Sequence, residues 1–170
     1  AKRHVPRIFE SDFQRVKAGV KEQSRLLADQ ISGSAQLNVK NPEALEKFLR
    51  EIVKEEAFIQ LLALTDLDGK RISQVHAQRG EKALFRPLLR QDFTEHNWFK
   101  EVLRSGQPYF SDLFVSRFTG ALITTAAYPI TDAKGKLVAV LDIDFKFEEM
   151  VKLLSDLPEG VLEAELTEVS

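Results

Sequence analysis

Apolar residues recur at helical spacing through residues 1–40, in an otherwise polar segment. Steps of three, four or seven positions separate most members of this stripe, which are Phe9, Phe13, Val16, Val20, Leu27 and Ile31. One apolar face repeated at this period predicts a long amphipathic helix. The stripe is narrow for its length, so two hypotheses stay open: the helix packs on its own domain, or it also pairs with a second subunit.

A second helix is predicted to begin at Asn41, because asparagine is a favoured N-cap and Pro42 suits the first helical position. Its expected buried face is Leu45, Phe48, Leu49, Ile52 and Val53. Residues 58–65 then predict a strand, residues 66–69 a hairpin turn, and residues 71–77 the returning strand. The turn lacks the further oxygen ligands and the terminal glutamate of a calcium loop, so we expect no calcium there.

Proline interrupts the pattern over residues 81–93, which predicts a short helical turn and an irregular loop. A helix is expected next, with Thr94 as its N-cap and Gly106 just past its end. Three strand-like runs follow, over residues 108–115, 121–130 and 136–145. The short turns between them predict a meander of antiparallel neighbours.

The last of these runs places a carboxylate among apolar residues. Period-two alternation puts Val138, Val140, Asp142 and Asp144 on one face of the strand and larger apolar side chains on the other. A carboxylate in that setting is costly unless it is paired or hydrogen-bonded. One hypothesis is therefore that Asp142 caps a loop or pairs with Arg117 or His96 and stabilises the fold.

Two stretches, HNWFKEVLRSGQPYFSDLF from His96 and TGALITTAAYPITDAKGKLVAVLDIDF from Thr119, resemble the Cache (PDC) sensor domains of bacterial receptors. The shared features are an aromatic pair on a helix, a Thr-Gly turn, an A-x-P-I strand and a closing strand with an acid before isoleucine. The resemblance covers residues 95–150, about a third of the chain. It implies an α+β fold in which a long N-terminal helix packs along a PAS-like central antiparallel sheet.

The resemblance also implies a ligand cavity. In the family, the acid at the place of Asp142 contacts the amino group of the ligand or an internal basic residue. Trp98 and Phe99 match a cavity-lining aromatic pair, of which we favour Trp98; the alternative is that both are core aromatics. Further lining residues are expected on the flanking strands, namely Tyr109, Phe110, Thr124, Thr125 and Tyr128.

Two positions depart from the amino-acid-binding members. His96 stands where an arginine usually clamps a carboxylate, and a histidine adds charge only when protonated, so anion affinity through it should weaken above neutral pH. Phe114, Ser116 and Arg117 stand where an aromatic, an acid and a small residue are usual. Arg117 offers a bidentate clamp for an anion, or is a solvated turn residue. The candidate ligand-binding residues are His96, Trp98, Phe99, Tyr109, Phe114, Ser116, Arg117, Tyr128 and Asp142.

Composition narrows the function classes. The net charge is −2, and no basic cluster alternates with aromatics, which argues against a nucleic-acid partner. The chain has no cysteine, which excludes disulfides, thiolate metal sites and cysteine nucleophiles. No phosphate loop, HExxH or nucleophile elbow is present, and the three histidines lie far apart in sequence. We therefore expect no enzymatic activity, no metal and no cofactor.

We expect three parts: residues 1–40, a long N-terminal helix; residues 41–155, a PAS-like core that ends in a helix over residues 147–154; and residues 156–170, a tail or linker opened by Pro158 and Gly160. The chain starts without methionine and has no run of about 18 apolar residues, so it reads as a piece of a longer protein without its membrane anchors.

The resemblance implies a periplasmic ligand-sensing domain of a bacterial receptor, of the histidine kinase, chemoreceptor or diguanylate cyclase type. Its partner would be a small carboxylate or amino acid, with a possible homodimer through the N-terminal helix. The alternative is a ligand-free dimerisation or partner-docking module with the same fold.

Overall fold

The computed structural model describes residues 4–90 and 92–155, and within them six strands form one antiparallel sheet. The strand order is β2-β1-β6-β5-β3, with β4 also paired to β5. The strands are β1 (Ile59–Thr65), β2 (His76–Ala77), β3 (Tyr109–Phe110), β4 (Phe114–Val115), β5 (Leu122–Thr131) and β6 (Leu137–Lys146). The predicted α+β fold with a central antiparallel sheet is confirmed.

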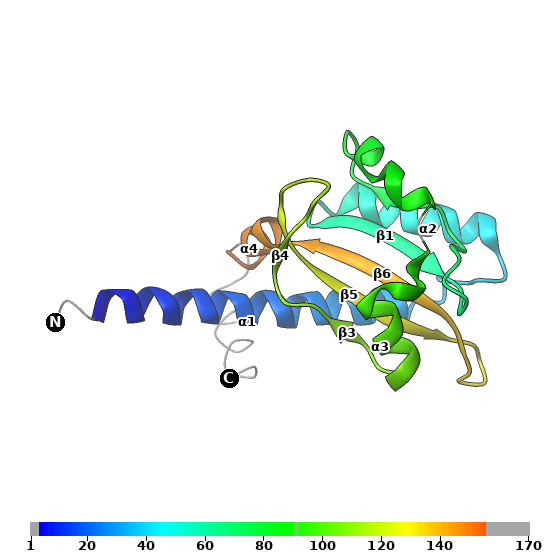
Figure 1. Ribbon diagram of the computed structural model, residues 1–170, viewed down its shortest axis with the longest axis horizontal. Helices are drawn as coiled ribbons and strands as arrows, with labels where there is room; N and C mark the ends of the chain where they lie inside the picture. The colour runs from blue at the N-terminus through cyan, green and yellow to red at the C-terminus, as the bar shows by residue number, and fades with distance from the viewer. Residues whose placement is uncertain (1–3, 91, 156–170) are drawn as a thin grey trace.

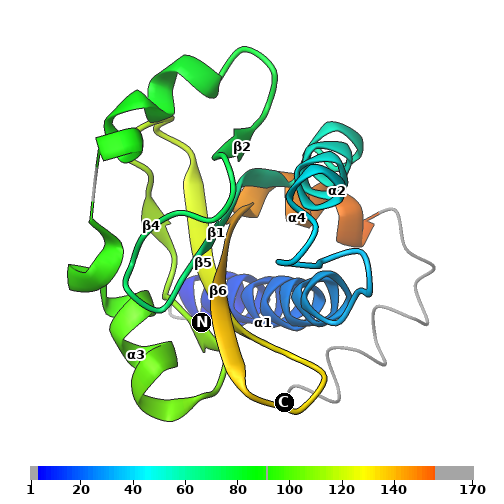
Figure 2. The ribbon, with the colours of Figure 1, turned by 90° about the vertical axis from the view of Figure 1, so that its right-hand side faces the viewer.

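Different elements cover the two faces of the sheet (Figure 2). One face packs against three helices, α1 (His4–Ser32), α2 (Pro42–Glu55) and α4 (Phe147–Ser155). The other face lies under two 3₁₀ segments, η1 (Lys82–Arg90) and η2 (Phe93–Glu95), and the helix α3 (Asn97–Ser105). The two layers enclose separate apolar clusters, so alternate residues of each long strand belong to different cores.

The long N-terminal helix is present and runs along the sheet, with its first turns projecting beyond it (Figure 1). Val20, Ala28 and Ile31 are buried against the sheet. Phe13 is 47% exposed, although its ring lies 6.1 Å from that of Phe147 on α4. The predicted stripe is thus buried where the helix meets the sheet and exposed where it projects.

Helix α2 begins as predicted. The Asn41 side chain accepts a hydrogen bond from the Ala44 amide at 3.2 Å, and Pro42 occupies the first helical position. Leu45, Leu49 and Val53 are buried. This helix covers the part of the sheet beside the C-terminal half of α1 (Figure 1).

Two predicted strands are interrupted. Over residues 71–77 only a Thr65–Arg71 bridge and the two residues of β2 pair with β1. Between them the Ile72 and Ser73 amides both donate to the Leu64 carbonyl, and the Ser73 hydroxyl accepts from the Leu64 amide at 2.9 Å in place of a backbone carbonyl. Over residues 108–115 the strand divides into β3 and β4, because the chain leaves the ladder after Ser111, whose hydroxyl donates to the Asp112 carbonyl at 2.9 Å.

The prediction that Thr94 caps the next helix is wrong. Asp92 caps η2 by accepting from the Thr94 amide at 2.9 Å, and α3 starts after His96 without a side-chain cap. A short 3₁₀ turn inserted before α3 displaces the start of the helix. Its end is as predicted: Gly106 has φ 68°, the left-handed conformation that glycine adopts without strain.

The helix predicted over residues 147–154 is α4. The tail predicted for residues 156–170, with Pro158 and Gly160, lies outside the described residues. None of the helices in residues 4–90 and 92–155 combines the length and the apolar character that a membrane span requires.

Candidate ligand-binding site

A cavity of about 370 Å³ lies between the sheet and the η1, η2 and α3 layer. Its walls come from five separate stretches of the chain, which the fold brings together. The lining residues are Leu88, Phe93, His96, Trp98, Phe114, Val115, Ser116, Arg117, Phe118, Ile123, Thr125, Asp142 and Asp144. Mostly apolar walls with a few converging polar groups are typical of a small-molecule site.

The floor of the cavity is formed by β5 and β6. Both cross-strand neighbours of Asp142 are alanines, Ala63 on β1 and Ala127 on β5. Directly paired residues in an antiparallel sheet point to the same face, so the cross-strand neighbours of the Asp142 carboxyl are methyl groups. This arrangement leaves room above the carboxyl for another molecule.

Asp142 is buried and its atom Oδ1 has no hydrogen-bond partner among the described residues. Burial, followed by the charge of Asp144, raises the pKa of Asp142 well above its ordinary value. The predicted pairing of Asp142 with Arg117 or His96 is not found in the described part of the chain. The hypothesis that Asp142 stabilises the fold by pairing with one of these two residues is therefore not supported.

Asp144 lies two residues further along the same face and is hydrogen-bonded. The Thr125 hydroxyl, on the facing strand, donates to its Oδ1 at 2.8 Å. Burial raises the pKa of Asp144; the hydrogen bond from Thr125 and the influence of Gln60 oppose that rise, and the net pKa is about 6. The floor thus holds one supported carboxyl and one unsupported carboxyl.

An aromatic wall closes one side of the cavity. The rings of Phe93, His96 and Trp98 pack on one another at centroid distances of 5.3 to 5.8 Å. Burial, and next the charge of Arg117, lowers the pKa of His96. His96 is therefore a neutral hydrogen-bonding group at neutral pH, and the protonated form on which its predicted anion affinity depends is lost at lower pH than expected.

Another part of the rim is the loop between β4 and β5. The Arg117 guanidinium lies 4.8 Å from the centroid of the Phe118 ring, a cation–π contact, and no ion pair holds it within residues 4–90 and 92–155. Phe114 and Val115 are 43% and 65% exposed at this rim. The rim therefore presents one cation and exposed apolar surface, whereas the floor presents two carboxyls.

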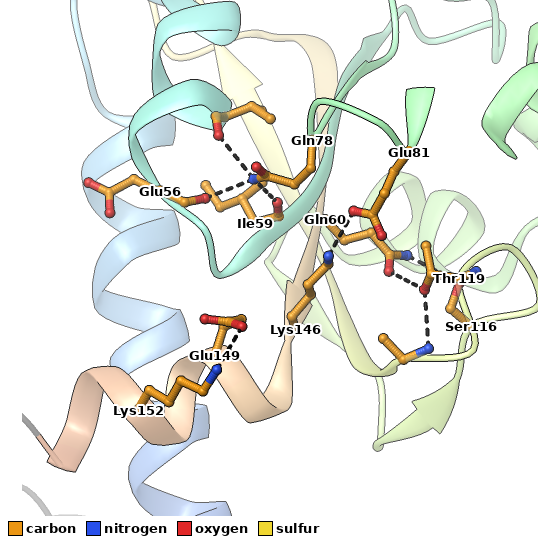
Figure 3. Close-up of polar contacts among 12 residues, drawn as sticks. Glu56, Ile59, Gln60, Gln78, Glu81, Ser116, Thr119, Lys146, Glu149 and Lys152 are labelled. Carbon is orange, nitrogen blue, oxygen red and sulfur yellow. Dashed lines mark hydrogen bonds and ion pairs between the residues drawn. The ribbon is translucent and has the colours of Figure 1, made fainter. Parts of the chain in front are cut away.

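A buried glutamine on β1 connects this rim to the sheet (Figure 3). Gln60 Nε2 donates to the Ser116 hydroxyl at 3.2 Å, and the Thr119 hydroxyl donates to Gln60 Oε1 at 2.7 Å. Sequence reasoning missed Gln60. A polar residue within an otherwise apolar run of strand residues was the available signal.

Six of the nine predicted ligand-binding residues line the cavity: His96, Trp98, Phe114, Ser116, Arg117 and Asp142. Their role in binding stays a prediction. Of the further strand residues, Thr125 lines the cavity, whereas Phe110 and Thr124 border a separate hollow beside α1.

Three predicted residues lie elsewhere. Phe99 is on the buried face of α3, with its ring edge-on to that of Trp98 at a centroid distance of 6.0 Å. Tyr109 packs at the border of the same apolar cluster. Tyr128 is on the opposite face of the sheet, where its hydroxyl donates to the Arg25 carbonyl of α1 at 3.4 Å. Alternation along β5 explains this placement, because Tyr128 is paired with Leu141 rather than with Asp142.

The lining residues that sequence reasoning missed are Leu88, Phe93, Val115, Phe118, Ile123 and Asp144. Asp144 and Ile123 were detectable, since they share strand faces with Asp142 and Thr125. Leu88 and Phe93 belong to the irregular segment, where no periodicity indicates which side chains turn inward.

An antiparallel sheet with a long helix along one face and a cavity under a short helix on the other defines a PAS-like sensor domain. Residues 45–152 match the family model described as the methyl-accepting chemotaxis protein-like, first PDC sensor domain. The match covers more than half of the chain, and the chain belongs to this family. The predicted resemblance to Cache (PDC) sensor domains is confirmed, and with it the assignment to ligand sensing in signal transduction.

Solved structures with this fold include ligand-binding domains of chemoreceptors. The domain of PctC from Pseudomonas aeruginosa PAO1, in complex with GABA, is 18% identical with a TM-score of 0.60, covering 91% of this chain and 65% of that one. The domain of CtaA from Pseudomonas fluorescens, in complex with L-serine, is 16% identical with a TM-score of 0.58, covering 94% and 66%. At these identities the likeness shows the fold.

A further solved structure is the extracellular ligand binding receptor from Desulfohalobium retbaense DSM5692, which is 14% identical with a TM-score of 0.58. The match covers 91% of this chain and 27% of that chain. The chain thus spans less than two thirds of each of these solved relatives.

One curated protein, named Citrate (Re)-synthase, from Syntrophus aciditrophicus (strain SB), is 26% identical over 164 residues. The aligned part is 96% of this chain but only 25% of that protein. The chain therefore spans a quarter of this relative, and the activity in its name is not carried over to the chain.

Proposed function

We propose that this domain binds a small amino acid or a related carboxylate in the cavity above Asp142, as the extracytoplasmic sensing part of a bacterial membrane receptor. The observation that carries the proposal is the buried Asp142 carboxyl with an unpartnered oxygen at the floor of an apolar-walled cavity. Such a group is costly in the empty domain and is stabilised by a cationic donor.

The two ends of an amino acid match the two ends of the cavity. At the floor, an ammonium group would donate one of its three N–H bonds to Asp142 Oδ1, which has no hydrogen-bond partner among the described residues. A carboxylate at the rim meets Arg117, whose planar fork matches carboxylate geometry. The aromatic wall and Ile123 are suited to the carbon skeleton between them.

The ligands bound in the solved relatives support this ligand class. PctC and CtaA were solved in complex with GABA and L-serine, and the ligand-binding domain of PctB, an amino acid chemoreceptor of Pseudomonas aeruginosa PAO1, in complex with L-Gln. A signal requires that the ligand bind two states of the receptor with different affinity, so closure of the α3 layer over the ligand would have to shift α1 or α4.

The remaining proposals concern the whole protein. The N-terminal part, residues 1–40, would lead from the membrane through helix α1, which ends at Ser32; residues 41–155 would be the sensing core, and residues 156–170 a linker. The domain itself would carry out no catalysis, and its output would belong to a kinase, chemoreceptor or cyclase. The exposed Phe13 and Val16 on the projecting part of α1 favour a homodimer through that helix.

A thermal-shift screen of the purified domain with amino acids, short carboxylates and amines tests the proposal, since a ligand that binds only the folded state raises the melting temperature. The Asp142→Asn variant keeps the shape of the side chain and should lose the response to amines and amino acids. Glu149→Gln is the control: the Glu149 side chain is partly exposed on α4, away from the cavity, and this variant should respond like the wild type. A wild-type domain that responds to none of these compounds contradicts the proposal.

A further inference from the structure

We propose that Gln60 is a positioning residue for ligand selectivity: its buried amide fixes the Arg117 loop over the acidic floor, and so favours ligands that carry a carboxylate besides an ammonium group. This inference rests on the proposed function of the cavity. It concerns a residue of β1 that does not itself line the cavity.

A β-bulge directs Gln60 toward the cavity side. The register between β1 and β6 shifts between Ile59, paired with Phe145, and Leu61, paired with Asp144, so Gln60 is an extra residue in the ladder. Ile59 belongs to the helix-covered cluster and Leu61 to the cavity-side cluster. The bulge therefore adds a polar side chain to a strand whose seven residues are all buried.

The two ends of the Gln60 amide hold the loop on both sides of Arg117. Its Nε2 donates to Ser116, directly before Arg117, and its Oε1 accepts from Thr119, two residues after it (Figure 3). The loop is also closed on itself, because the Ser116 hydroxyl accepts from the Phe118 amide at 3.2 Å and the Gly120 amide donates to the Ser116 carbonyl at 2.8 Å. Arg117 is thus carried by a short, internally bonded loop with a fixed attachment point.

The same amide reaches the floor of the cavity. Gln60 lowers the pKa of Asp144, against the rise caused by burial, so the amide acts on the acidic floor as well as on the loop. The Gln60 amide uses one N–H for Ser116 and its carbonyl oxygen for Thr119, which leaves its second N–H directed at neither of them. Gln60 therefore links the cationic rim to the acidic floor, the two groups that an amino acid would contact.

Removing this amide should affect the two ends of a ligand unequally. Gln60→Leu leaves the Thr119 hydroxyl and the Ser116 hydroxyl without their buried partner, so the loop loses its attachment to β1. The Asp142 carboxyl keeps its alanine neighbours and its place in the sheet. Affinity for the carboxylate end should fall, while affinity for an ammonium group should be retained.

Gln78 supplies a matched control. Its Nε2 also donates to partly buried acceptors, the carbonyls of Val53, Glu56 and Ile59 at 3.0, 3.0 and 2.6 Å (Figure 3). These contacts join the end of α2 to the start of β1, and none of them involves the cavity loop. Gln78→Leu thus removes a comparable amide without touching the rim.

The binding experiment uses two pairs of probes that differ only by a carboxylate: L-serine with ethanolamine, and GABA with propylamine. Calorimetric titration measures the affinity of the wild type and of each variant for the probe pairs that the wild type binds. Gln60→Leu should lower the affinity for the carboxylate-bearing probe about tenfold or more, corresponding to the loss of a charged contact. It should lower the affinity for the matching amine less than about threefold. Gln78→Leu should leave the ratio within each pair unchanged. Equal weakening of both members by Gln60→Leu overturns the proposal.

Hydrogen exchange of the unliganded domain separates this inference from the proposed function. The amides of Ser116, Phe118, Thr119 and Gly120 should exchange at least tenfold faster in Gln60→Leu than in the wild type, and not in Gln78→Leu. Unchanged exchange in this loop overturns the role of Gln60 whether or not any probe binds. A wild type that binds none of the four probes overturns the proposed ligand class, and exchange alone then decides the role of Gln60 in holding the loop.

Discussion

The two faces of one sheet differ in what their side chains can tolerate. On the face covered by α1, α2 and α4, β6 contributes Ala139, Leu141, Ile143 and Phe145, all fully buried and apolar. On the other face the same strand contributes Asp142 and Asp144, one of them with an unpartnered oxygen. The first face holds the fold together through close packing, whereas the second keeps polar groups that weaken the empty domain and suit a ligand.

The largest effect on stability should come from the helix-covered face. Leu141→Ala should lower the free energy of unfolding by about 2–5 kcal/mol, because the side chain is fully buried between Leu64 and Tyr128 and its removal leaves a cavity. Urea denaturation followed by circular dichroism measures the change. Leu141→Met, which conserves volume, should cost less than about 1.5 kcal/mol. A small effect of the alanine variant would show that this face is not tightly packed.

On the cavity face, Asp142→Asn should have the opposite sign. Replacing an unpartnered buried carboxyl by a neutral amide should raise the free energy of unfolding at pH 7 by about 1–3 kcal/mol. The same denaturation experiment measures it, alongside the loss of ligand response. A destabilised Asp142→Asn domain would mean that the carboxyl stabilises the fold, contrary to the comparison of the two faces.

The acidic floor should also make stability depend on pH. The pKa of Asp144 is raised to about 6 and that of Asp142 is raised as well, so between about pH 4 and their folded values the folded state binds more protons than the unfolded chain. Their contribution to stability is therefore largest near pH 4 and falls as the pH rises through 6. Asp144→Asn should recover about 1–2 kcal/mol at pH 7 and almost nothing at pH 4.

Melting temperatures of both proteins between pH 4 and pH 8 measure this difference. The pKa values of His76 and His96 are lowered in the folded state, so the unfolded chain binds protons more readily at these residues and their contribution makes stability rise with pH. This contribution is the same in the wild type and in the variant. The difference between wild type and variant isolates the carboxyl. A difference that is constant over this pH range would rule out the raised pKa as its cause.

The smallest effect on stability should come from the rim. Arg117→Gln should change the free energy of unfolding by less than about 0.5 kcal/mol, since the side-chain contact that Arg117 makes within the described part of the chain is the one with the Phe118 ring. The affinity of this variant for L-serine should nevertheless fall, and its affinity for ethanolamine, which has no carboxylate, should fall less. Arg104→Gln, an exposed change on α3, is the control for charge alone. Equal L-serine affinity in the wild type, Arg117→Gln and Arg104→Gln would show that Arg117 does not contact the ligand.

Several parts of the site were predictable from local patterns. Alternation along residues 136–145 put Asp142 and Asp144 together on the face away from the large apolar side chains, as the structure has them. The helical pattern around Trp98 and the glycine after it located α3 to within a few residues. Thr94 was misassigned because the 3₁₀ turn capped by Asp92 uses the same residue types as a helix start.

Other parts were not predictable because they depend on pairing. Alternation separates Thr124 and Tyr128 from Thr125, but it does not say which set faces the cavity; the packing of Tyr128 against α1 decides that. Gln60 was missed because a bulge, which depends on the partner strand, turns it to the cavity side.

The sequence by itself determined the kinds of elements, their order and the membership of the family, because periodicity, caps and turns are properties of neighbouring residues. Only the tertiary structure decided that alanines of two other strands flank Asp142, and that Gln60 contacts Ser116, 56 residues further along the chain. The physical reason is that a cavity consists of contacts between distant segments. Strand register and helix packing create those contacts, and local patterns do not specify them.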